Sequence, residues 1–484
     1  FCQGYSDCRR HWSGLWGAMA ASKAAALLVM CLVAFFSYLA VGMIAPFLPQ
    51  HLKAMGISER WSGVIFAAYS VAMISTTPLC NKLVGRYGRM PLIVGGLLAQ
   101  AIATFGFGRF NDSLTVLLLT RALQGCGASA SNLAMFALVA DLFEDSLGRV
   151  MGLSEVVIGA GFSIGPLVGA LLYAQGGFPM PFIVCSIILA VVAVLTPVLL
   201  GIGGSSAAAA PGAPASPAGA EGSALSRLWA ACTCGLLAPA GLLLQGTAVW
   251  GVVDSGFYTV HAANELRLDQ TAIGLNLAAA SAAYSGVGLV AGTVADRIGY
   301  GPTMLIGAAC SASSLLLLGP AAPIASEVIA GLLSSQDLVD VQRWYEFGML
   351  IFLGFGQAFM LIPSLGAMKS AVPSGDATAT EACVSLFNAF QQAGLVFGPL
   401  ASSALGSQYA FGNTCIAGVM LTYSALMGPR LRRGAQKGDS LLQYHQAPPP
   451  SPMVSQFSPM SVHMTPPPEM RRPSNEGLPG KLAI

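Results

Sequence analysis

Residues 181–200 read PFIVCSIILAVVAVLTPVLL, an unbroken run of twenty residues without a charge. A helix of about 20 apolar residues crosses the hydrocarbon core of a bilayer. The proline at position 197 is compatible with such a helix, because neighbouring helices satisfy the backbone groups that it frees. This stretch therefore predicts a membrane-spanning helix.

The composition of the whole chain also indicates a protein surrounded by lipid. Only 9% of the 484 residues are charged, 55% are hydrophobic, and the mean hydropathy is +0.68. Soluble globular proteins have about 25% charged residues, so this chain cannot cover a water-facing surface. The net charge of +2 is spread thinly over the loops and indicates no nucleic-acid partner. An integral membrane protein in a lipid bilayer is expected.

The same length rule predicts twelve spans in two sets of six, separated by a Gly-, Ala-, Ser- and Pro-rich cytosolic linker at residues 201–230. Residues 1–23 are predicted to be a cytosolic segment, and residues 429–484 a disordered, Pro- and Ser-rich cytosolic tail. Helical bundles are predicted at residues 24–200 and 231–428. The spans are residues 24–48, 61–79, 91–108, 114–138, 151–173, 181–200, 236–261, 272–294, 303–320, 347–368, 380–405 and 411–427.

Positive charge orients these spans, because Lys and Arg concentrate in the loops on one side. By the positive-inside rule, that side, both termini and the linker are cytosolic. The plasma membrane and a vesicle or vacuole membrane are both compatible with this topology. The cations are Lys82, Arg86, Arg89, Arg149, Arg227, Arg297, Lys369, Arg430, Arg432 and Arg433.

The two halves of the sequence resemble each other. Residues 86–88 (RYG) align with residues 297–299 (RIG), and residues 161–166 (GFSIGP) align with residues 394–399 (GLVFGP). Parallel repeats of six helices place a binding site at mid-membrane between the halves of a transporter. Rocking of one half on the other then gives alternating access.

The loop between the second and third spans, residues 81–89 (NKLVGRYGR), returns in the second half as residues 292–299 (GTVADRIG). It resembles the Gly-x-Leu-Ala-Asp-Arg-x-Gly-Arg pattern of the major facilitator superfamily. The resemblance covers nearly all of residues 24–427. It implies an all-α membrane protein with twelve transmembrane helices in two six-helix repeats, and secondary transport.

The resemblance also implies a cytosolic gate, in which loop cations pair with acids at neighbouring helix ends and latch the halves in one state. Arg89 is expected to pair with Asp141 at the end of the fourth span. Gly85 stands where the family usually carries Asp, so the latch is either weaker here or shifted to Asp296. Ordinary positive-inside anchoring is the alternative. The gate residues are Arg86, Arg89, Asp141, Asp296 and Arg297.

Arg121 and Gln124 lie on the fourth span, in a stretch (RALQGCG, 121–127) that resembles a motif of some proton-coupled members. An arginine at this depth costs about 2.5–3.5 kcal/mol to insert, so it is expected to face the interior and to have an acidic or carbonyl partner. In the family it is thought to tune the proton affinity of a neighbouring carboxyl group. A structural arginine bonded to helix carbonyls is the alternative.

The fifth span carries Gly161, Gly165, Pro166 and Gly169 at the spacing of the family's antiporter motif. Small residues three and four apart let two helices touch closely, and proline bends a helix. The motif implies a tight seam that seals against proton leak, as an exchanger needs. Generic helix packing is the alternative.

Asp254 is the one carboxyl group well inside a span, on the seventh, and an ionisable residue there indicates function. It is a candidate for carrying the coupling proton, for binding a cationic substrate, or for both in alternation. Trp250, Phe257 and Tyr258 are predicted to form a cation–π wall beside it. A hydrated position near the outer interface is the alternative.

Four further polar residues are candidates for the same cavity. Glu155 lies in the first turns of the fifth span, and Asn388, Gln391 and Gln392 supply polarity at helical spacing on the eleventh. Cavity lining and interhelical bonding would both explain the three amides.

Within the superfamily, the chain resembles the vesicular amine and polyamine transporter branch of the drug:proton antiporters. Residues 316–320 (LLLGP), residues 362–363 (IP) and the stretch 386–405 carry this finer resemblance. The branch commonly has an acid on its first helix, whereas this chain has Ser37, Tyr38 and Met43 there.

The leading hypothesis is a proton-coupled antiporter that moves an organic cation, amine or drug-like solute by alternating access. A carrier of organic anions or neutral solutes, with Arg121 as the binding cation, is the first alternative. A transporter-like sensor or scaffold is the second. No catalytic constellation is present in the sequence, so no enzyme, cofactor or metal site is expected. The expected partners are a small-molecule substrate, a proton as coupling ion and the lipid bilayer, with the protein a monomer.

Overall fold

The computed structural model describes residues 23–143, 147–202, 236–333, 337–370, 377–406 and 408–446. Within these ranges some side chains lie outside the description, among them those of Asp141, Glu155 and Glu381. The predicted linker at 201–230 and most of the predicted tail lie outside the described residues.

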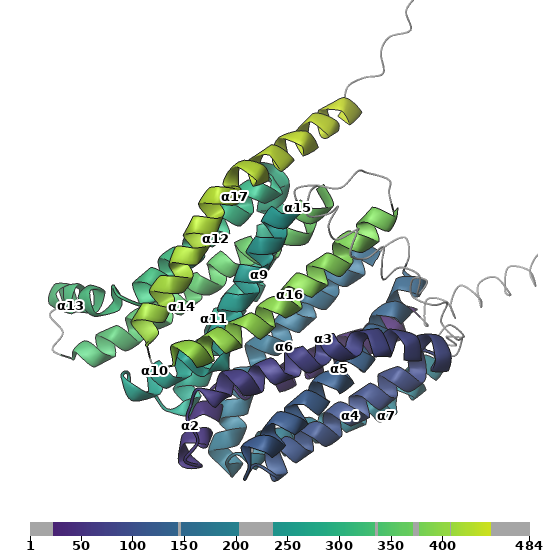
Figure 1. Cartoon of the computed structure of the whole chain (residues 1–484), viewed down its shortest axis with the longest axis horizontal. Helices are drawn as coiled ribbons and strands as arrows, with labels where there is room; N and C mark the ends of the chain where they lie inside the picture. The colour runs from purple at the N-terminus through teal and green to yellow at the C-terminus, as the bar shows by residue number, and fades with distance from the viewer. Residues whose placement is uncertain are drawn as a thin grey trace, which may run out of the picture. The chain divides into compact units, whose positions relative to one another are not determined.

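The described residues form helices joined by short turns, with no strand among them (Figure 1). A first helix, Lys23–Gly42, precedes the labelled ones. The seventh span comprises α9 (Leu237–Val252), a π-helical segment η4 (Val253–Phe257) and α10 (Tyr258–Asn264). The other helices are α2 (Leu48–Ala54), α3 (Trp61–Tyr87), α4 (Arg89–Arg109), α5 (Leu114–Leu142), α6 (Leu147–Gly176), α7 (Pro179–Ile202), α11 (Gln270–Ile298), α12 (Tyr300–Leu318), α13 (Ala322–Leu333), α14 (Leu338–Leu361), α15 (Ser364–Ser370), α16 (Ala377–Leu405) and α17 (Tyr409–Gln446).

Among the described residues, ten helices are long and apolar enough to cross a membrane, and a bent pair within α11 makes an eleventh. The helix α16 occupies the place of the remaining predicted span. It carries several polar residues, which include Asn388, Gln391 and Gln392, and it is not among the ten. Each predicted span therefore overlaps a helix, and the predicted all-α class is confirmed.

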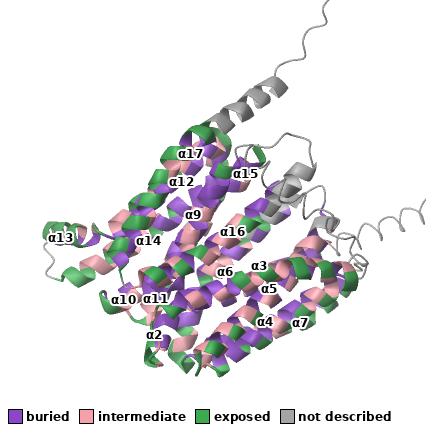
Figure 2. Cartoon of the chain, in the orientation of Figure 1, coloured by how far each residue is buried: buried purple, intermediate pink, exposed green. Residues whose placement is uncertain are grey.

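Figure 2 shows exposed residues along the outward faces of these helices, and many large apolar side chains are among the exposed residues, as lipid requires. Ile102, Leu119 and Val194, from three different spans, are each about two-thirds exposed, at 66%, 64% and 65%. Contiguous exposure of such side chains is unfavourable in water and is expected in hydrocarbon.

The internal repeat is visible in the backbone at two equivalent glycines. Gly88 ends α3 with φ 84°, and Gly299 ends α11 with φ 90°. Their N–H groups bond to the carbonyls of Val84 and Ala295, which are themselves equivalent in the two halves. Positive φ favours glycine, because a side chain would clash with the backbone there. The loop motif is thus a helix stop that turns the chain directly into the next span.

Helix packing repeats as well, and it depends on glycines at equivalent positions. Gly96 of α4 lies against the backbone of α5, as Gly307 of α12 lies against that of α14. Gly165 of α6 lies against the first helix, as Gly398 of α16 lies against α9. Figure 1 shows α4, α5 and α7 together in the first half and α12 and α14 together in the second. The predicted pairing of two six-helix repeats accounts for this arrangement.

The halves meet along two helix pairs, α3 with α16 and α6 with α11. Gly63 of α3 leaves no room for a side chain beside Pro399 of α16. Ser163 of α6 and Ser285 of α11 approach to 3.2 Å between their hydroxyl oxygens. The described residues up to Asp439 form one compact unit. The last helix, α17, continues to Gln446, whereas the tail was expected to begin at residue 429.

The close approach of α6 to the first helix predicts the effect of a single methyl group. A Cβ at Gly169 would overlap the carbonyl oxygen of Met43 and lie 2.9 Å from its Cβ. We expect Gly169→Ala to destabilise the protein by about 1–3 kcal/mol through overpacking. The matched control is Gly95→Ala on α4, where an added Cβ meets nothing within 4 Å. Thermal unfolding in detergent measures both, and equal melting temperatures would contradict the close packing described here.

Candidate functional site

A small cavity lies between the two halves, lined by five membrane-spanning helices. It measures about 30 Å³, enough for one or two water molecules and far less than a drug-sized ligand occupies. The first helix, α3 and α6 line it from one half, and α9, η4 and α16 from the other. The lining residues are Tyr38, Val41, Gly42, Phe66, Tyr69, Ser70, Met73, Phe162, Gly251, Asp254, Gln392, Leu395 and Pro399.

Asp254 enters this cavity from the π-helical segment η4, where the seventh span is broken. Inside η4, Gly256 has φ 105°, a conformation that favours glycine. A Cβ at Gly256 would lie 2.5 Å from Pro49 and 3.1 Å from the hydroxyl of Ser62, both in the first half. Single-turn π segments occur frequently at functional sites. The break therefore lets helix seven approach the first half closely and turns Asp254 into the cavity.

Asp254 is the one carboxylate among the residues that line the cavity, and no lysine or arginine accompanies it. No hydrogen bond joins its side chain to the described residues. The other polar groups of the lining are uncharged, and two of them, the hydroxyl of Tyr69 and Oε1 of Gln392, are buried without a hydrogen-bond partner. The rings of Tyr38 and Phe162 pack at 5.2 Å between centroids. An anionic group beside aromatic rings suits a cation.

Arg121 lies behind the cavity wall and not in it. Its side chain is 1% exposed, and its guanidinium lies 5.3 Å from the ring centroids of both Phe66 and Tyr69, which line the cavity. It donates to Gln124 Oε1 at 2.5 Å and to the carbonyl of Val41 at 3.4 Å. The carbonyl partner predicted for this arginine is present. No acidic partner is found for it among the described side chains.

Gln124 completes this buried network. Its Nε2 donates to Thr104 on α4 at 2.9 Å. The network therefore ties α5 to α4 and to the first helix. The residue that aligns with Gln124 in the second half, Gln357, is fully buried, and neither of its amide atoms has a partner among the described residues.

The three amide side chains predicted on α16 lie in different surroundings. Gln392 lines the cavity, whereas Gln391 and Asn388 do not, although both lie on the same helix. Asn388 is exposed and Gln391 half-buried. The side chain of Glu155 lies outside the described residues.

The aromatic wall predicted beside Asp254 is also placed differently. Trp250 packs edge-on against Tyr284 of α11 at 5.9 Å between centroids, while Phe257 and Tyr258 pack against Tyr409. None of these lines the cavity. Helix seven is π-helical at 253–257, so residues past Asp254 rotate away from the position that a regular helix would give them.

The predicted gate residues lie where α3 and α11 end. Arg86 and Arg297 are exposed, and the guanidinium of Arg86 lies 5.3 Å from the ring of Tyr87. Asp296 is exposed as well. Arg89 is buried, at 6% exposure. Its predicted partner Asp141 has a side chain outside the described residues.

The glycines of the predicted antiporter motif line one face of α6. Added Cβ atoms at Gly161, Gly165 and Gly169 would each meet backbone of the segment from Phe35 to Met43. On the other face, Pro166 lies against Gly274 of α11, in the second half. The helix α6 is therefore closely packed against both halves.

Sequence reasoning missed a buried ionisable pair, His261 of α10 and Glu346 of α14. His261 Nε2 lies 3.0 Å and 3.1 Å from the two carboxylate oxygens of Glu346. Glu346 fell one residue outside the predicted span 347–368, and 85 residues separate the two partners. No spacing rule connects residues so far apart. The position of a histidine at the end of an apolar span was the only available signal.

The sequence is similar to known transporters over nearly its whole length. The model of the Major Facilitator Superfamily matches residues 30–257 and again residues 247–456. Multidrug resistance protein 2 of Bacillus subtilis is 32% identical over 161 residues, which is 33% of this chain and 40% of that protein. Quinolone resistance protein NorA of Staphylococcus aureus is 27% identical over 149 residues, 31% of this chain and 38% of that protein. The matched part is thus less than half of these relatives.

Solved structures of transporters share the fold at low sequence identity. The nucleoside transporter NupG matches with a TM-score of 0.63 and 10% identity, over 84% of this chain and 98% of that one. A bacterial homologue of the human lysosomal transporter Spinster, in an inward-facing and unoccupied conformation, matches with a TM-score of 0.62 and 13% identity, over 86% of this chain and 97% of that one. Such identities establish the fold alone.

The position of Arg121 predicts a structural effect that lysine cannot replace. Lysine keeps the charge but lacks the planar fork that reaches Gln124 and Val41 together. We expect Arg121→Lys to destabilise the protein by about 1.5–3 kcal/mol, the value of hydrogen bonds to a charged group. Arg86→Lys, at an exposed arginine of the same half, is the control and should change stability by less than about 0.5 kcal/mol. Thermal unfolding of the purified variants in detergent is the measurement. Equal stability of the two variants would contradict the network.

Proposed function

Because the chain belongs to the major facilitator superfamily and is a multi-pass membrane transporter, we propose that it is a proton-coupled antiporter of organic cations. The proposed substrates are amines or drug-like cations. The names of the relatives, multidrug and quinolone resistance proteins, support this substrate class. The proposed coupling ion is the proton.

The observation that carries the proposal is the position of Asp254. It is the one carboxylate in the cavity between the halves, and no cationic side chain lines that cavity with it. A carboxylate surrounded by apolar helices is strongly disfavoured while it remains charged and unpaired. Binding either a proton or a cation neutralises it. The two ligands therefore compete for one group, which is the simplest basis for exchange.

Alternating access follows if only the neutralised forms change conformation. With a proton or a cation on Asp254, the halves can rock past each other without burying a net charge. The charged, empty form costs more to occlude, so the transporter does not cycle unloaded. Uptake of a proton on one side thus drives release of a cation there.

The surroundings of Arg121 support a cation substrate over an anion. Phe66 and Tyr69 stand between its guanidinium and the cavity, and its two terminal nitrogens donate to Gln124 and Val41. An anion in the cavity would meet the carboxylate of Asp254 before it met this arginine. In this proposal Arg121 positions the first helix and the rings of Phe66 and Tyr69.

The size of the cavity implies that substrate binding moves the helices. A drug-sized ligand needs about 300 Å³ or more, and the cavity offers about 30 Å³. The proposed moving bodies are the two bundles, 24–200 and 231–428, with cytosolic termini and the gate residues Arg86, Arg89, Asp141, Asp296 and Arg297 at the cytosolic end. The glycines of α6 keep its seam with the first helix closed during the motion. The protein is proposed to work as a monomer.

The proposal predicts the consequence of removing the charge of Asp254. In proteoliposomes with an acidic interior, we expect the wild-type protein to accumulate ethidium, a permanent organic cation, in exchange for protons. Asp254→Asn should lower the initial rate by at least about tenfold, because a charge-assisted contact in the cavity is lost. Asp254→Glu, which keeps the carboxylate, should retain more of the rate than the Asn variant.

The control variant is Glu327→Gln, at an exposed carboxylate on α13, which should transport as the wild type does. Equal uptake by the wild type and Asp254→Asn would refute the proposed role of Asp254. Accumulation of an organic anion under the same gradient, with no uptake of ethidium, would refute the substrate class.

A further inference from the structure

A second ionisable site lies on helix seven, outside the cavity. The side chains of His261 and Glu346 are 5% and 0% exposed, and the imidazole bridges both carboxylate oxygens. Gln342, one turn before Glu346 on α14, donates to Glu346 Oε1 at 2.9 Å. The carboxylate of Glu346 is therefore fully enclosed by protein. Such burial costs free energy, and in membrane helices it is rare at positions without a function.

The groups around the pair are acids and phenols, with no other cation in contact. On its own helix, Glu265 Oε2 lies 3.2 Å from His261 Nδ1, and Tyr258 lies one turn away. Tyr409 of α17 stacks on the imidazole at 3.9 Å between centroids and 8° between planes. On α14, Tyr345 is adjacent to Glu346 and donates to a backbone carbonyl of α12. Arg343, one turn before Glu346 on α14, pairs with Asp340 and donates to the carbonyl of Leu266 after α10. Among the described residues, His261 is the basic group within salt-bridge distance of Glu346.

The helix that carries His261 also carries a contact between the two halves. Thr259 Oγ1, two residues before His261, donates to the carbonyl of Ala45 in the first half at 2.9 Å. Gln270, after α10, donates to Gln50 of α2. We call these two hydrogen bonds, together with the packing of Gly256 on Pro49, the outer contact. Figure 1 shows α2 beside α10 and α11 at this end.

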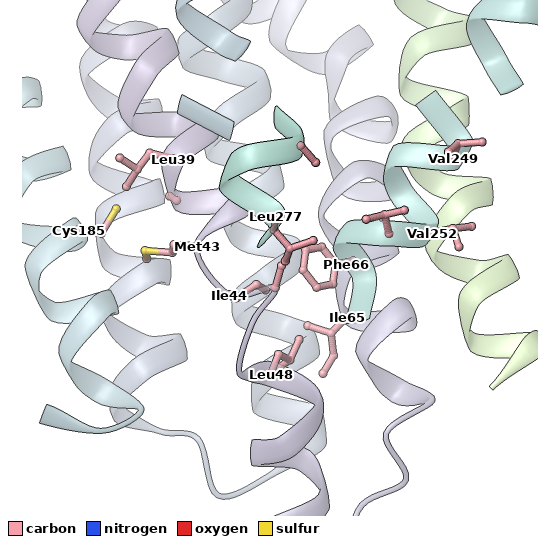
Figure 3. Packing of buried hydrophobic residues seen from close by; sticks show 14 of the residues in the cluster. Leu39, Met43, Ile44, Leu48, Ile65, Phe66, Cys185, Val249, Val252 and Leu277 are labelled. Atoms are coloured by element: carbon pink, nitrogen blue, oxygen red, sulfur yellow. The ribbon is translucent and has the colours of Figure 1, made fainter. Parts of the chain in front are cut away.

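The outer contact closes over an apolar cluster shared by the halves. Ile44, Leu48, Ile65 and Leu277 belong to it and are fully buried (Figure 3). By the proposed topology this end faces away from the cytosol. Opening it requires α10 to move away from the first half.

The break in helix seven allows α10 to move separately from α9. The π segment with its positive-φ glycine interrupts the regular hydrogen-bond ladder between the two helices. Tyr409 contacts His261 and also Phe257 of the π segment, at 5.3 Å. A change in the pair therefore acts on the same short helix that makes the outer contact.

We propose that His261 and Glu346 form a second proton-binding site, distinct from Asp254, whose occupancy controls the outer contact. The inference rests on the proposed proton-coupled function, and it assigns the site at which the proton closes this end of the transporter. With a proton on His261, the attraction between the imidazolium and the Glu346 carboxylate holds α10 on α14 and the outer contact is made. Loss of that proton removes the attraction, so α10 is released and this end opens.

The test is a distance measured between the halves without substrate. Spin labels are attached at Ser113 and Leu338, exposed residues at the ends of α5 and α14, after replacement of the eleven native cysteines. Double electron–electron resonance is recorded on the full chain in lipid nanodiscs between about pH 8 and pH 5, the range over which histidine–carboxylate switches act. We expect the wild type to shift from a long- to a short-distance population on acidification.

The variants assign the shift to the pair. Glu346→Gln, which removes the carboxylate that attracts the imidazolium, should show the long distance at every pH, and His261→Gln should lose the dependence on pH. Should Glu346→Gln fail to fold, His261→Gln decides the question alone. Glu265→Gln is the matched control at the exposed acid beside His261 and should keep the shift, as should Asp254→Asn.

The other histidine at this end provides a further control. His51 of α2 stacks on Phe178 at 3.6 Å, and burial lowers its pKa. His51→Phe should retain the shift. An unchanged distance in the wild type, a shift that survives in both pair variants, or one that disappears in Asp254→Asn or His51→Phe would overturn the proposal. Because no substrate is present, these outcomes are independent of whether ethidium is transported.

Discussion

The Asp254 carboxylate has to be neutralised where it lies, between two bundles of apolar helices. No described side chain does this permanently: the cavity holds no lysine or arginine, and Arg121 is held behind the wall by Gln124, Val41 and the aromatic rings. In a medium of low polarity, an unpaired charge is far more costly than in water. The neutralising partner must therefore be a mobile one, and this requirement shapes the rest of the proposed mechanism.

The backbone around Asp254 also fits a carboxylate that needs a mobile partner. A regular helix seven would keep its residues at fixed angular intervals, but the π segment and Gly256 break this register at the level of Asp254. The break brings helix seven against Pro49 and leaves α10 as a short separate element. On one side of the break lies the carboxylate of the cavity, and on the other lies the His261–Glu346 pair. Asp254 and His261, one from each proposed proton site, thus lie on the same interrupted span.

The sequence predicted what hydropathy and repetition determine. The spans follow from runs of apolar residues, and the matched stops at Gly88 and Gly299 follow from motifs that the two halves share. The glycines of α6 were expected to give a close helix contact, and they do so against the first helix. Asp254 was identified because an acid inside a span is rare.

Side-chain contacts were harder to predict, for physical reasons. Gln391 and Gln392 are neighbours about 100° apart on a helix, so a small error in the helix's rotation decides which of them lines the cavity. The partners of Arg121 depend on how three helices pack, which composition does not specify. His261 and Glu346 come from spans that are distant in sequence, and only the tertiary fold brings them together.

The central claim is that a proton and an organic cation share one carboxylate. The most direct measurement is the release of protons when ethidium binds to the purified protein in a weakly buffered detergent solution, followed with a pH-indicator dye. Under mildly acidic conditions, we expect a release that approaches about one proton per bound cation, and none from Asp254→Asn. Binding of ethidium to the wild type at all pH values without any proton release would contradict it.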